Sequence, residues 1–253
     1  MAIIAIANQK GGVGKTTTAV NLSAALQRLN KKALLIDLDS QAHASTWLFG
    51  NPADEDKGSH AVIVKKVNIN DEILTSTSGI DMLLGNSEMA SLDLELVLQQ
   101  ELNREHRLTK ALSKLKNKYD YILIDCPPAL GLAVMNAFVA ANVIIMPIDS
   151  KGESYQSTPR ILTTIKHVSE ELGKSFDVYA LPTLVERTNL AKQVVEAIEK
   201  DFPNKVLPSI HKNTKIAEAF VARQTIFDYD NSASGAKDYS LVAEVLTKWL
   251  NEN

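Results

Sequence analysis

Short apolar runs alternate with longer amphipathic stretches along most of this 253-residue chain. The runs are rich in Val, Ile and Leu, as expected of strands that are buried on both faces of a parallel sheet. The stretches between them are long enough for crossover helices. The candidate strands are residues 3–7, 33–36, 80–84, 121–124, 143–148, 178–184 and 206–210. The sequence therefore predicts an α/β fold, in which a mostly parallel twisted sheet carries helices on both faces.

The chain contains no repeat, no low-complexity tract and no Pro/Gly/Ser linker, which predicts a single domain over residues 1–253. Its 45% hydrophobic and 23% charged residues are typical of a globular protein. The single cysteine, Cys126, excludes a disulfide framework. The N-terminus lacks the basic segment and cleavage site of a signal peptide, and no apolar run is long enough to span a bilayer. We therefore expect the cytoplasm and no membrane contact.

Several local signals predict where helices begin and where a loop lies. Thr158 followed by Pro159 predicts a helix start, and Asp238 predicts the start of a terminal helix. Residues 51–70 carry the least pattern, and within them residues 54–58 predict a solvated loop. Residues 92–102 predict a helix that faces the core, or faces a partner if the protein dimerises. The five histidines show no metal-ligand spacing, which predicts surface or packing roles for all of them.

A glycine-rich segment follows the first apolar run and opens an amphipathic stretch. Glycines at this position let the backbone turn with its N–H groups inward, and the helix N-terminus adds a partial positive charge, so the segment can hold a polyphosphate. Lys15 is placed to bridge the β- and γ-phosphates, and the Thr16 hydroxyl can bind Mg²⁺. The predicted phosphate-binding residues are Lys10, Gly11, Gly12, Val13, Gly14, Lys15, Thr16 and Thr17.

Two acidic residues end predicted strands. Asp125 follows an apolar run and precedes two prolines, an arrangement in which a carboxylate holds Mg²⁺ through a water ligand. Asp37 also lies at a strand end, where a structural hydrogen-bond acceptor is the simpler interpretation. Ligand groups in open α/β sheets gather at this carboxyl edge, so we expect Asp125, and Asp39 on the turn after residues 33–36, to lie near the phosphate loop.

The glycine-rich segment departs from the usual phosphate-loop pattern because Gln9 stands where its first glycine is expected, with Lys10 beside it. In this form residues 10–16 make a deviant Walker A motif, and here the chain resembles the ParA/MinD family of ATPases. The resemblance is closest to the chromosomal ParA (Soj) branch and covers nearly the whole chain. It also rests on residues 37–41, 125–128, 187–190, 226–230 and 234–236.

The resemblance implies ATP and Mg²⁺ as cofactors and a homodimer that forms around ATP. Lys10 is then the signature lysine, which reaches the phosphates of the partner, as an arginine finger supplied in trans does. Asp39 is then the residue that positions the attacking water, and it joins Thr16 and Asp125 near the metal. Ser40 and His43 depart from the family pattern around Asp39.

Two further residues are candidates for contact with the adenine base. Asn213 aligns with an Ile-Pro-Arg-Asn stretch that lines the adenine pocket of relatives, although His211 replaces the proline. Thr183 ends the apolar run 178–184 and lies either near the base or in simple strand-end packing.

A local excess of positive charge lies near the C-terminus. Residues 205–225 contain four Lys or Arg residues and one acidic residue, in a chain whose net charge is -3. Such a patch is either a solvated face of mixed charge or a surface that contacts DNA phosphates without reading sequence. By the resemblance, the DNA-contact candidates are Arg187, Lys212, Lys215 and Arg223.

These features favour a DNA-partitioning ATPase of the cytoplasm and nucleoid. An ATP-bridged dimer would bind DNA nonspecifically, and hydrolysis stimulated by a ParB-like partner would release it. A positioning ATPase for a protein cargo and a metabolic P-loop enzyme are alternatives. A MinD-like membrane cycler is a further alternative, although the tail, residues 246–253, has one lysine and one glutamate and lacks a basic amphipathic helix.

Overall fold

The computed structural model describes residues 1–253 except 101, 152 and 253, and leaves the side chains of 153, 154 and 157 undescribed. Seven strands form one sheet in the order β3-β4-β2-β5-β1-β6-β7. Every described pairing is parallel except that of β3 with β4. The predicted fold class is therefore confirmed. The strands are β1 (Ala2–Ile6), β2 (Ala33–Asp37), β3 (Ile73–Thr75), β4 (Asp81–Leu83), β5 (Tyr121–Asp125), β6 (Val143–Asp149) and β7 (Asp177–Thr183).

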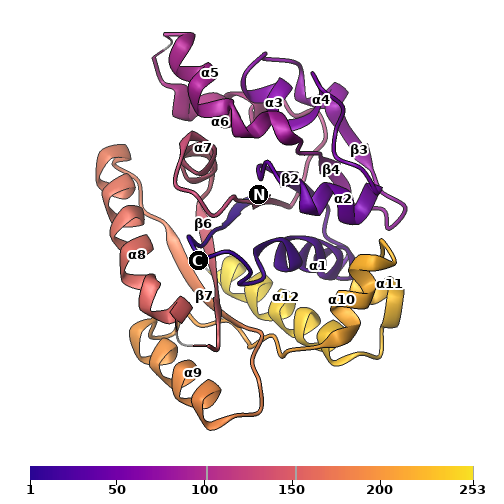
Figure 1. The fold of residues 1–253 in the computed structure, drawn as a ribbon, viewed down its shortest axis with the longest axis vertical. Helices are drawn as coiled ribbons and strands as arrows, with labels where there is room; N and C mark the ends of the chain where they lie inside the picture. The colour runs from indigo at the N-terminus through magenta and orange to yellow at the C-terminus, as the bar shows by residue number, and fades with distance from the viewer. Residues whose placement is uncertain (101, 152, 253) are drawn as a thin grey trace.

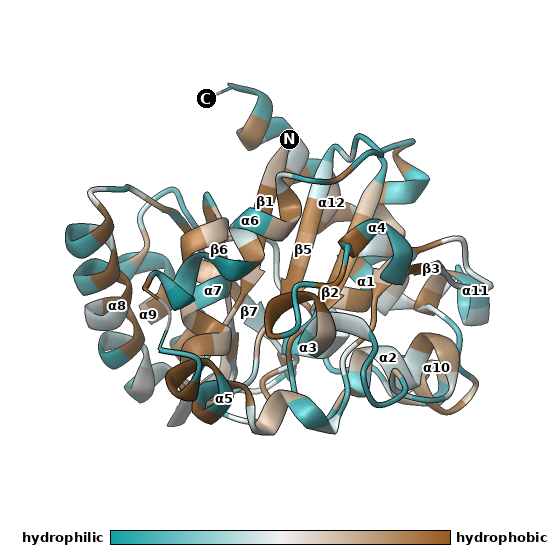
Figure 2. Cartoon of the chain, turned by 90° about the horizontal axis from the view of Figure 1, so that it is seen from above, coloured by the Kyte–Doolittle hydropathy of each residue, from teal (hydrophilic) through white to brown (hydrophobic). Residues whose placement is uncertain are grey.

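Helices cover both faces of the sheet, and each layer encloses its own apolar cluster (Figure 1). One face carries α1 (Lys15–Arg28), α2 (His43–Phe49), α10 (Thr214–Val221), α11 (Ile226–Asp230) and α12 (Ser234–Glu252). The other face carries α3 (Gly58–Ile63), α5 (Leu92–Leu98), α6 (Arg107–Leu112), α7 (Leu132–Ala140), α8 (Glu153–Leu172) and α9 (Asn189–Asp201). Shorter helices are α4 (Ile69–Glu72), η1 (Ser87–Ala90) and η2 (Arg104–His106). The central strand β5 is buried along its length and is hydrophobic from Ile122 to Ile124 (Figure 2).

The strand register sets the position of the acidic residues. Ile6 of β1 and Asp37 of β2 both pair with Asp125 of β5. These three strands therefore end at one level, and the chain that leaves each of them emerges at the same edge. The glycine-rich loop follows Ile6, so the fold brings this loop and both predicted strand-end carboxylates together.

The expected strand at 206–210 is wrong. Val206 and His211 form isolated bridges to Ala180 and Val185, and the chain between them runs beside β7 without a continuous ladder. Pro208 has no N–H to donate and interrupts the pairing. The short antiparallel edge strand β3 was not expected, because three residues carry too little pattern to reveal it.

The predicted starts of two helices are also wrong. α8 begins at Glu153 and carries Pro159 inside, and α12 begins at Ser234 rather than at Asp238. Residues 54–57 form an exposed loop as expected, and Gly58, the last residue of the expected loop, begins α3.

The helix expected in residues 92–102 exists as α5, but it faces the core with only part of its surface. Leu92 and Leu96 are fully buried, whereas Leu94 and Leu98 are 63% and 69% exposed. Among the described residues, no helix is both long enough and apolar enough to cross a bilayer.

Candidate functional site

The glycine-rich loop joins β1 to α1 and leaves the start of α1 open. Gly12 and Gly14 have φ angles of 75° and 89°, a left-handed conformation that side chains other than glycine rarely adopt. No side chain caps the N-terminus of α1. The first N–H groups of the helix therefore remain available to an anion, as the phosphate-loop prediction requires.

Lys15 is buried at the start of α1, and its Nζ donates to the carbonyl oxygen of Lys10 at 3.2 Å. Burial lowers the pKa of Lys15, while the nearby carboxylates of Asp125 and Asp39 act in the opposite direction. A buried ammonium group beside two carboxylates can hold the phosphates of a nucleotide, because the phosphates supply further negative charge.

Asp125 is the clearest metal-binding candidate. It is 1% exposed, and neither of its carboxylate oxygens has a hydrogen-bond partner among the residues that the structure describes. Burial raises the pKa of Asp125 well above its ordinary value, and Asp37 adds to this shift, whereas Thr16 and Lys15 oppose it. A buried carboxylate without partners is costly unless a ligand completes the site. The donor set of Asp125 and Thr16 therefore fits Mg²⁺.

Asp37 and Asp39 lie two residues apart but have different surroundings. Asp37 is fully buried and accepts hydrogen bonds from the Ser45 N–H, the Ser45 hydroxyl and the Asp39 N–H at 3.0, 2.7 and 3.1 Å. Burial raises the pKa of Asp37 to about 6. Asp39 is partly exposed, and its Oδ1 accepts from the Gln41 N–H at 3.0 Å. Asp37 thus holds the loop that presents Asp39, as the structural interpretation of Asp37 predicted.

A cavity of about 530 Å³ lies beside the loop and includes Gly14, Thr16 and Thr17 in its lining. Thr183 and Asn213 both line it, so the structure brings together the two residues predicted to contact the base. The Thr183 hydroxyl donates to the Val13 carbonyl at 2.8 Å, which also gives it the alternative role in packing at the strand end.

Asn213 is fixed by hydrogen bonds at both ends of its amide. Its Oδ1 accepts from the Lys215 N–H at 2.8 Å and so caps α10, and its Nδ2 donates to the Ser234 hydroxyl at 2.7 Å. The cavity wall nearest α10 is therefore held in place by the start of α12.

The aromatic wall of this cavity was not foreseen from the sequence. Trp47 and Phe220 line it and meet edge to face with ring centroids 5.2 Å apart. Trp47 is buried, and its Nε1–H donates to the Gln224 carbonyl at 2.7 Å. These contacts join α2 to the end of α10, which is distant in sequence, so no local signal could have revealed them.

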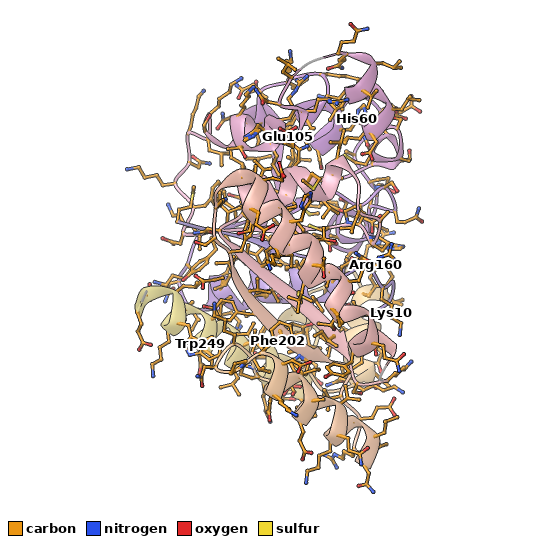
Figure 3. All side chains as sticks on the ribbon, turned by 90° about the vertical axis from the view of Figure 1, so that its left-hand side faces the viewer. Lys10, His60, Glu105, Arg160, Phe202 and Trp249 are labelled. Atoms are coloured by element: carbon orange, nitrogen blue, oxygen red, sulfur yellow. The ribbon has the colours of Figure 1, made fainter. Side chains whose placement is uncertain are left out.

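Lys10, which Figure 3 labels, pairs with a carboxylate of its own chain. Its Nζ is 3.5 Å from Oδ2 of Asp149, a buried residue that ends β6. The backbone N–H of Lys10 donates to Asn8 Oδ1 at 3.0 Å. No local pattern pointed to Asp149, because the strand end that carries it is far along the chain.

The four DNA-contact candidates do not form one uncompensated patch. Lys212 pairs with Glu186 at 2.7 Å, and Lys215 pairs with Glu218 at 2.8 Å. Arg187 is exposed next to Glu186, so it lies near Lys212.

Arg223 lies apart from that group and packs against the C-terminal end of α2. A Cβ added at Gly50 would lie 2.2 Å from its guanidinium Nη1. The charge count over residues 205–225 did not include Glu186, which the fold brings to Lys212.

Comparisons with known proteins agree with this geometry. The model of the AAA domain family matches residues 1–178. The chain is 37% identical to the sporulation initiation inhibitor protein Soj of Bacillus subtilis, over 94% of both chains. It is 31% identical to the chromosome partitioning protein ParA of Caulobacter vibrioides, over 97% of this chain and 94% of that protein.

Two solved structures share the fold over nearly their full length. Cobyrinic acid a,c-diamide synthase from Mycobacterium smegmatis with bound ADP and magnesium has a TM-score of 0.86 at 28% identity, covering 100% of this chain and 97% of that one. The septum site-determining protein MinD of Pyrococcus horikoshii, complexed with Mg-ADP, has a TM-score of 0.79 at 25% identity, covering 98% and 97%. Because partitioning proteins match it at over 30% identity along almost all of its length, this chain belongs to the Soj/ParA family of ATPases.

Proposed function

We propose that this protein is a DNA-partitioning ATPase that uses ATP and Mg²⁺ to switch its affinity for DNA. The observation that carries the proposal is the buried carboxylate of Asp125, for which the described residues supply no hydrogen-bond partner, beside a glycine-rich loop whose helix start has no side-chain cap. Both features lack a partner that a magnesium nucleotide would supply. The names of the Soj and ParA relatives support the role in partitioning.

In this proposal each residue of the site has a separate task. Lys15 and the loop N–H groups hold the phosphates, and Thr16 and Asp125 hold the magnesium ion, with Asp39 close by. Asp39 orients the attacking water. Lys10 leaves Asp149 and reaches the phosphates of the partner in an ATP-bridged homodimer. Thr183 and Asn213 contact the adenine base.

DNA contact in the proposal is electrostatic and independent of sequence. Arg187, Lys212, Lys215 and Arg223 contact phosphates, and two copies of these residues in a dimer double the number of contacts. A ParB-like partner stimulates hydrolysis and releases the dimer from DNA. The protein then acts in the cytoplasm at the nucleoid, without a membrane contact.

The experiment is a DNA-binding titration with ATP, ADP or no nucleotide, using the wild type and Lys15→Ala. We expect ATP to raise the affinity of the wild type for two unrelated duplexes and to leave Lys15→Ala unchanged. Arg28→Ala is a matched control, because Arg28 ends the same helix on the far side from the loop and stacks on Phe227. Equal DNA affinity in all nucleotide states would refute the proposal.

Other outcomes of the same experiment identify the alternatives. ATP-dependent binding to anionic vesicles in place of DNA would indicate a MinD-like membrane cycler. ATP hydrolysis and dimerisation without DNA or vesicle binding would favour a positioning ATPase for a protein cargo. The likeness to a protein named as a diamide synthase keeps a metabolic enzyme as the third alternative, for which neither dimerisation nor DNA affinity should depend on ATP.

A further inference from the structure

Three potential metal ligands converge away from the nucleotide site. His60 on α3, Glu88 on η1 and Glu95 on α5 each offer one ligand atom, and these atoms all lie within 4.8 Å of one another. His60 Nε2 is 3.1 Å from Glu95 Oε1. Figure 3 shows His60 well separated from Lys10, so the cluster is distinct from the phosphate loop.

The imidazole at the centre of the cluster has no anchor outside it. His60 is 1% exposed, and its second ring nitrogen, Nδ1, is buried without a hydrogen-bond partner in the part of the chain that the structure describes. Buried histidines normally use both nitrogens. Here the only described hydrogen bond of the ring leads to Glu95, a member of the cluster. Among the described residues the ring is therefore held by a single hydrogen bond, at the nitrogen that faces Glu95.

The donor set and its spacing match a divalent transition cation. One imidazole nitrogen and two carboxylate oxygens are ligands that zinc accepts, at metal–ligand distances of about 2.0–2.2 Å. Tetrahedral geometry at those distances places the ligand atoms roughly 3.3–3.6 Å apart. The His60–Glu95 pair, at 3.1 Å, is slightly closer than that spacing, and the other pairs of ligand atoms lie within 4.8 Å of one another.

The two glutamates also provide access from solvent. Glu88 and Glu95 are both partly exposed, whereas His60 is buried. A cation can therefore enter from the carboxylate side, and a water molecule can fill a remaining ligand position. The ion would balance the negative charge of the two carboxylates.

We propose that His60, Glu88 and Glu95 form a binding site for a divalent transition cation, with zinc as the best match. Such an ion would tie α3 to η1 and α5. The backbone N–H of Leu132 donates to Asp93 of α5 at 2.9 Å, at the end of the loop that follows Asp125. The ion would thus stabilise α5, the helix whose Asp93 holds the end of the loop that follows Asp125. This effect does not depend on DNA binding.

The competing explanation is a network of hydrogen bonds alone. The Ser91 hydroxyl donates to the same Glu95 oxygen that contacts His60. In that case the ring and the carboxylate need no ion, and Glu88 is an ordinary surface residue. Glu88 therefore distinguishes the two explanations, because no described hydrogen bond or ion pair involves its carboxylate.

The test is a zinc titration of nucleotide-free protein from which metals have been removed, followed by calorimetry and by thermal unfolding. Cobalt(II) serves as a visible probe, because a nitrogen–oxygen site of low coordination number gives characteristic absorption. The variants are Glu88→Gln, Glu95→Gln and His60→Gln. His167→Gln is the matched control, because His167 is exposed on α8.

We expect one zinc ion per chain and a higher Tm with zinc in the wild type and in His167→Gln. Each cluster variant should bind at least tenfold more weakly and lose the increase in Tm. Glu88→Gln should show this weaker binding while its Tm without metal stays that of the wild type. The test therefore remains valid even if His60→Gln folds poorly. Absence of zinc binding, or equal binding by Glu88→Gln and the wild type, would overturn the proposal.

Discussion

Asp37 and Asp39 illustrate how burial gives two nearby carboxylates different roles. Asp37 lies inside the sheet and accepts three hydrogen bonds, so its contribution is to the folded structure. Asp39 lies just beyond the strand end and is partly exposed, so it can face a substrate. Substitution of each should therefore change a different measured quantity.

Removing the Asp39 carboxylate should slow hydrolysis far more than it weakens ATP binding. Positioning of a reacting water is worth about 10²–10⁴ in rate, and this contribution is absent from the bound ground state. We expect Asp39→Ala to reduce the rate of ATP hydrolysis within that range while its Kd for ATP changes by less than about tenfold. The measurement is steady-state turnover with DNA present, alongside calorimetric titration. Wild-type turnover would contradict the role given to Asp39.

Removing the Asp37 carboxylate should instead destabilise the fold. The Ser45 N–H, the Ser45 hydroxyl and the Asp39 N–H would lose their acceptor, at a cost of about 3 kcal/mol in the free energy of unfolding. For a chain of this size that corresponds to a decrease in Tm of roughly 6–12 °C. Thermal unfolding of Asp37→Ala, with Asp54→Ala in an exposed loop as control, measures the difference. An unchanged Tm would show that Asp37 holds nothing in place.

The contact between Lys10 and Asp149 makes a prediction about assembly. If Lys10 must leave Asp149 to reach a partner subunit, Lys10→Ala should still bind ATP as a monomer but should fail to form the ATP-dependent dimer. Light scattering with ATP measures the oligomeric state. A normal ATP dimer formed by Lys10→Ala would rule out a role in trans. Asp149→Asn removes the opposing charge and should shift dimerisation to lower ATP concentrations.

At the scale of elements, α10 links the nucleotide cavity to the proposed DNA surface. Asn213 at its start and Phe220 near its end line the cavity, while Lys215 on its first turn faces outward and pairs with Glu218. The contact of Trp47 with Gln224 fastens the end of α10 to α2, which follows Asp39. α10 is therefore the element through which a conformational change at the cavity would be passed to the basic residues.

The lysines around α10 can be tested through the salt dependence of DNA binding. Each phosphate contact contributes about 0.9 to the slope of log K against log salt, so Lys212→Ala/Lys215→Ala should flatten the slope of a dimer by up to roughly 3.6. Partial neutralisation by Glu186 and Glu218 should make the observed change smaller.

A control for this double substitution comes from two other helices. Lys166 and Lys192 are exposed lysines that pair with a glutamate four residues later, so Lys166→Ala/Lys192→Ala removes the same charge elsewhere. We expect the control to keep the wild-type slope. Equal slopes for both double variants would place the DNA contacts outside α10.

At the scale of the whole molecule, the sheet separates two apolar clusters that unfold together if the chain is one domain. Leu246 of α12 is fully buried in the cluster beneath α1, whereas Leu241 of the same helix is 49% exposed. We expect Leu246→Ala to lower the free energy of unfolding by about 2–5 kcal/mol and Leu241→Ala to change it by less than about 0.5 kcal/mol. Calorimetry should show one transition in each case. Two separate transitions would argue against a single domain over residues 1–253.

The sequence by itself determined the order of the central strands along the chain, the glycine-rich loop and the position of the Asp125 carboxylate at a strand end. These features are local, because each depends on a short apolar run followed directly by glycine, lysine, aspartate or proline. Element ends were less predictable. Pro159 follows a residue suited to capping a helix, yet the helix passes through it, since packing on the sheet outweighs a local preference.

Only the tertiary structure decided which distant side chains meet. It joined Lys212 to Glu186, Lys10 to Asp149 and Trp47 to Gln224 after α10. The first two contacts change the interpretation of lysines that the sequence had already singled out. It also placed His60 beside Glu95, although no metal-ligand spacing links them in sequence. The physical reason is that parallel strands need long crossovers, so residues that share an edge of the sheet are separated by whole helices, and no local pattern records their contact.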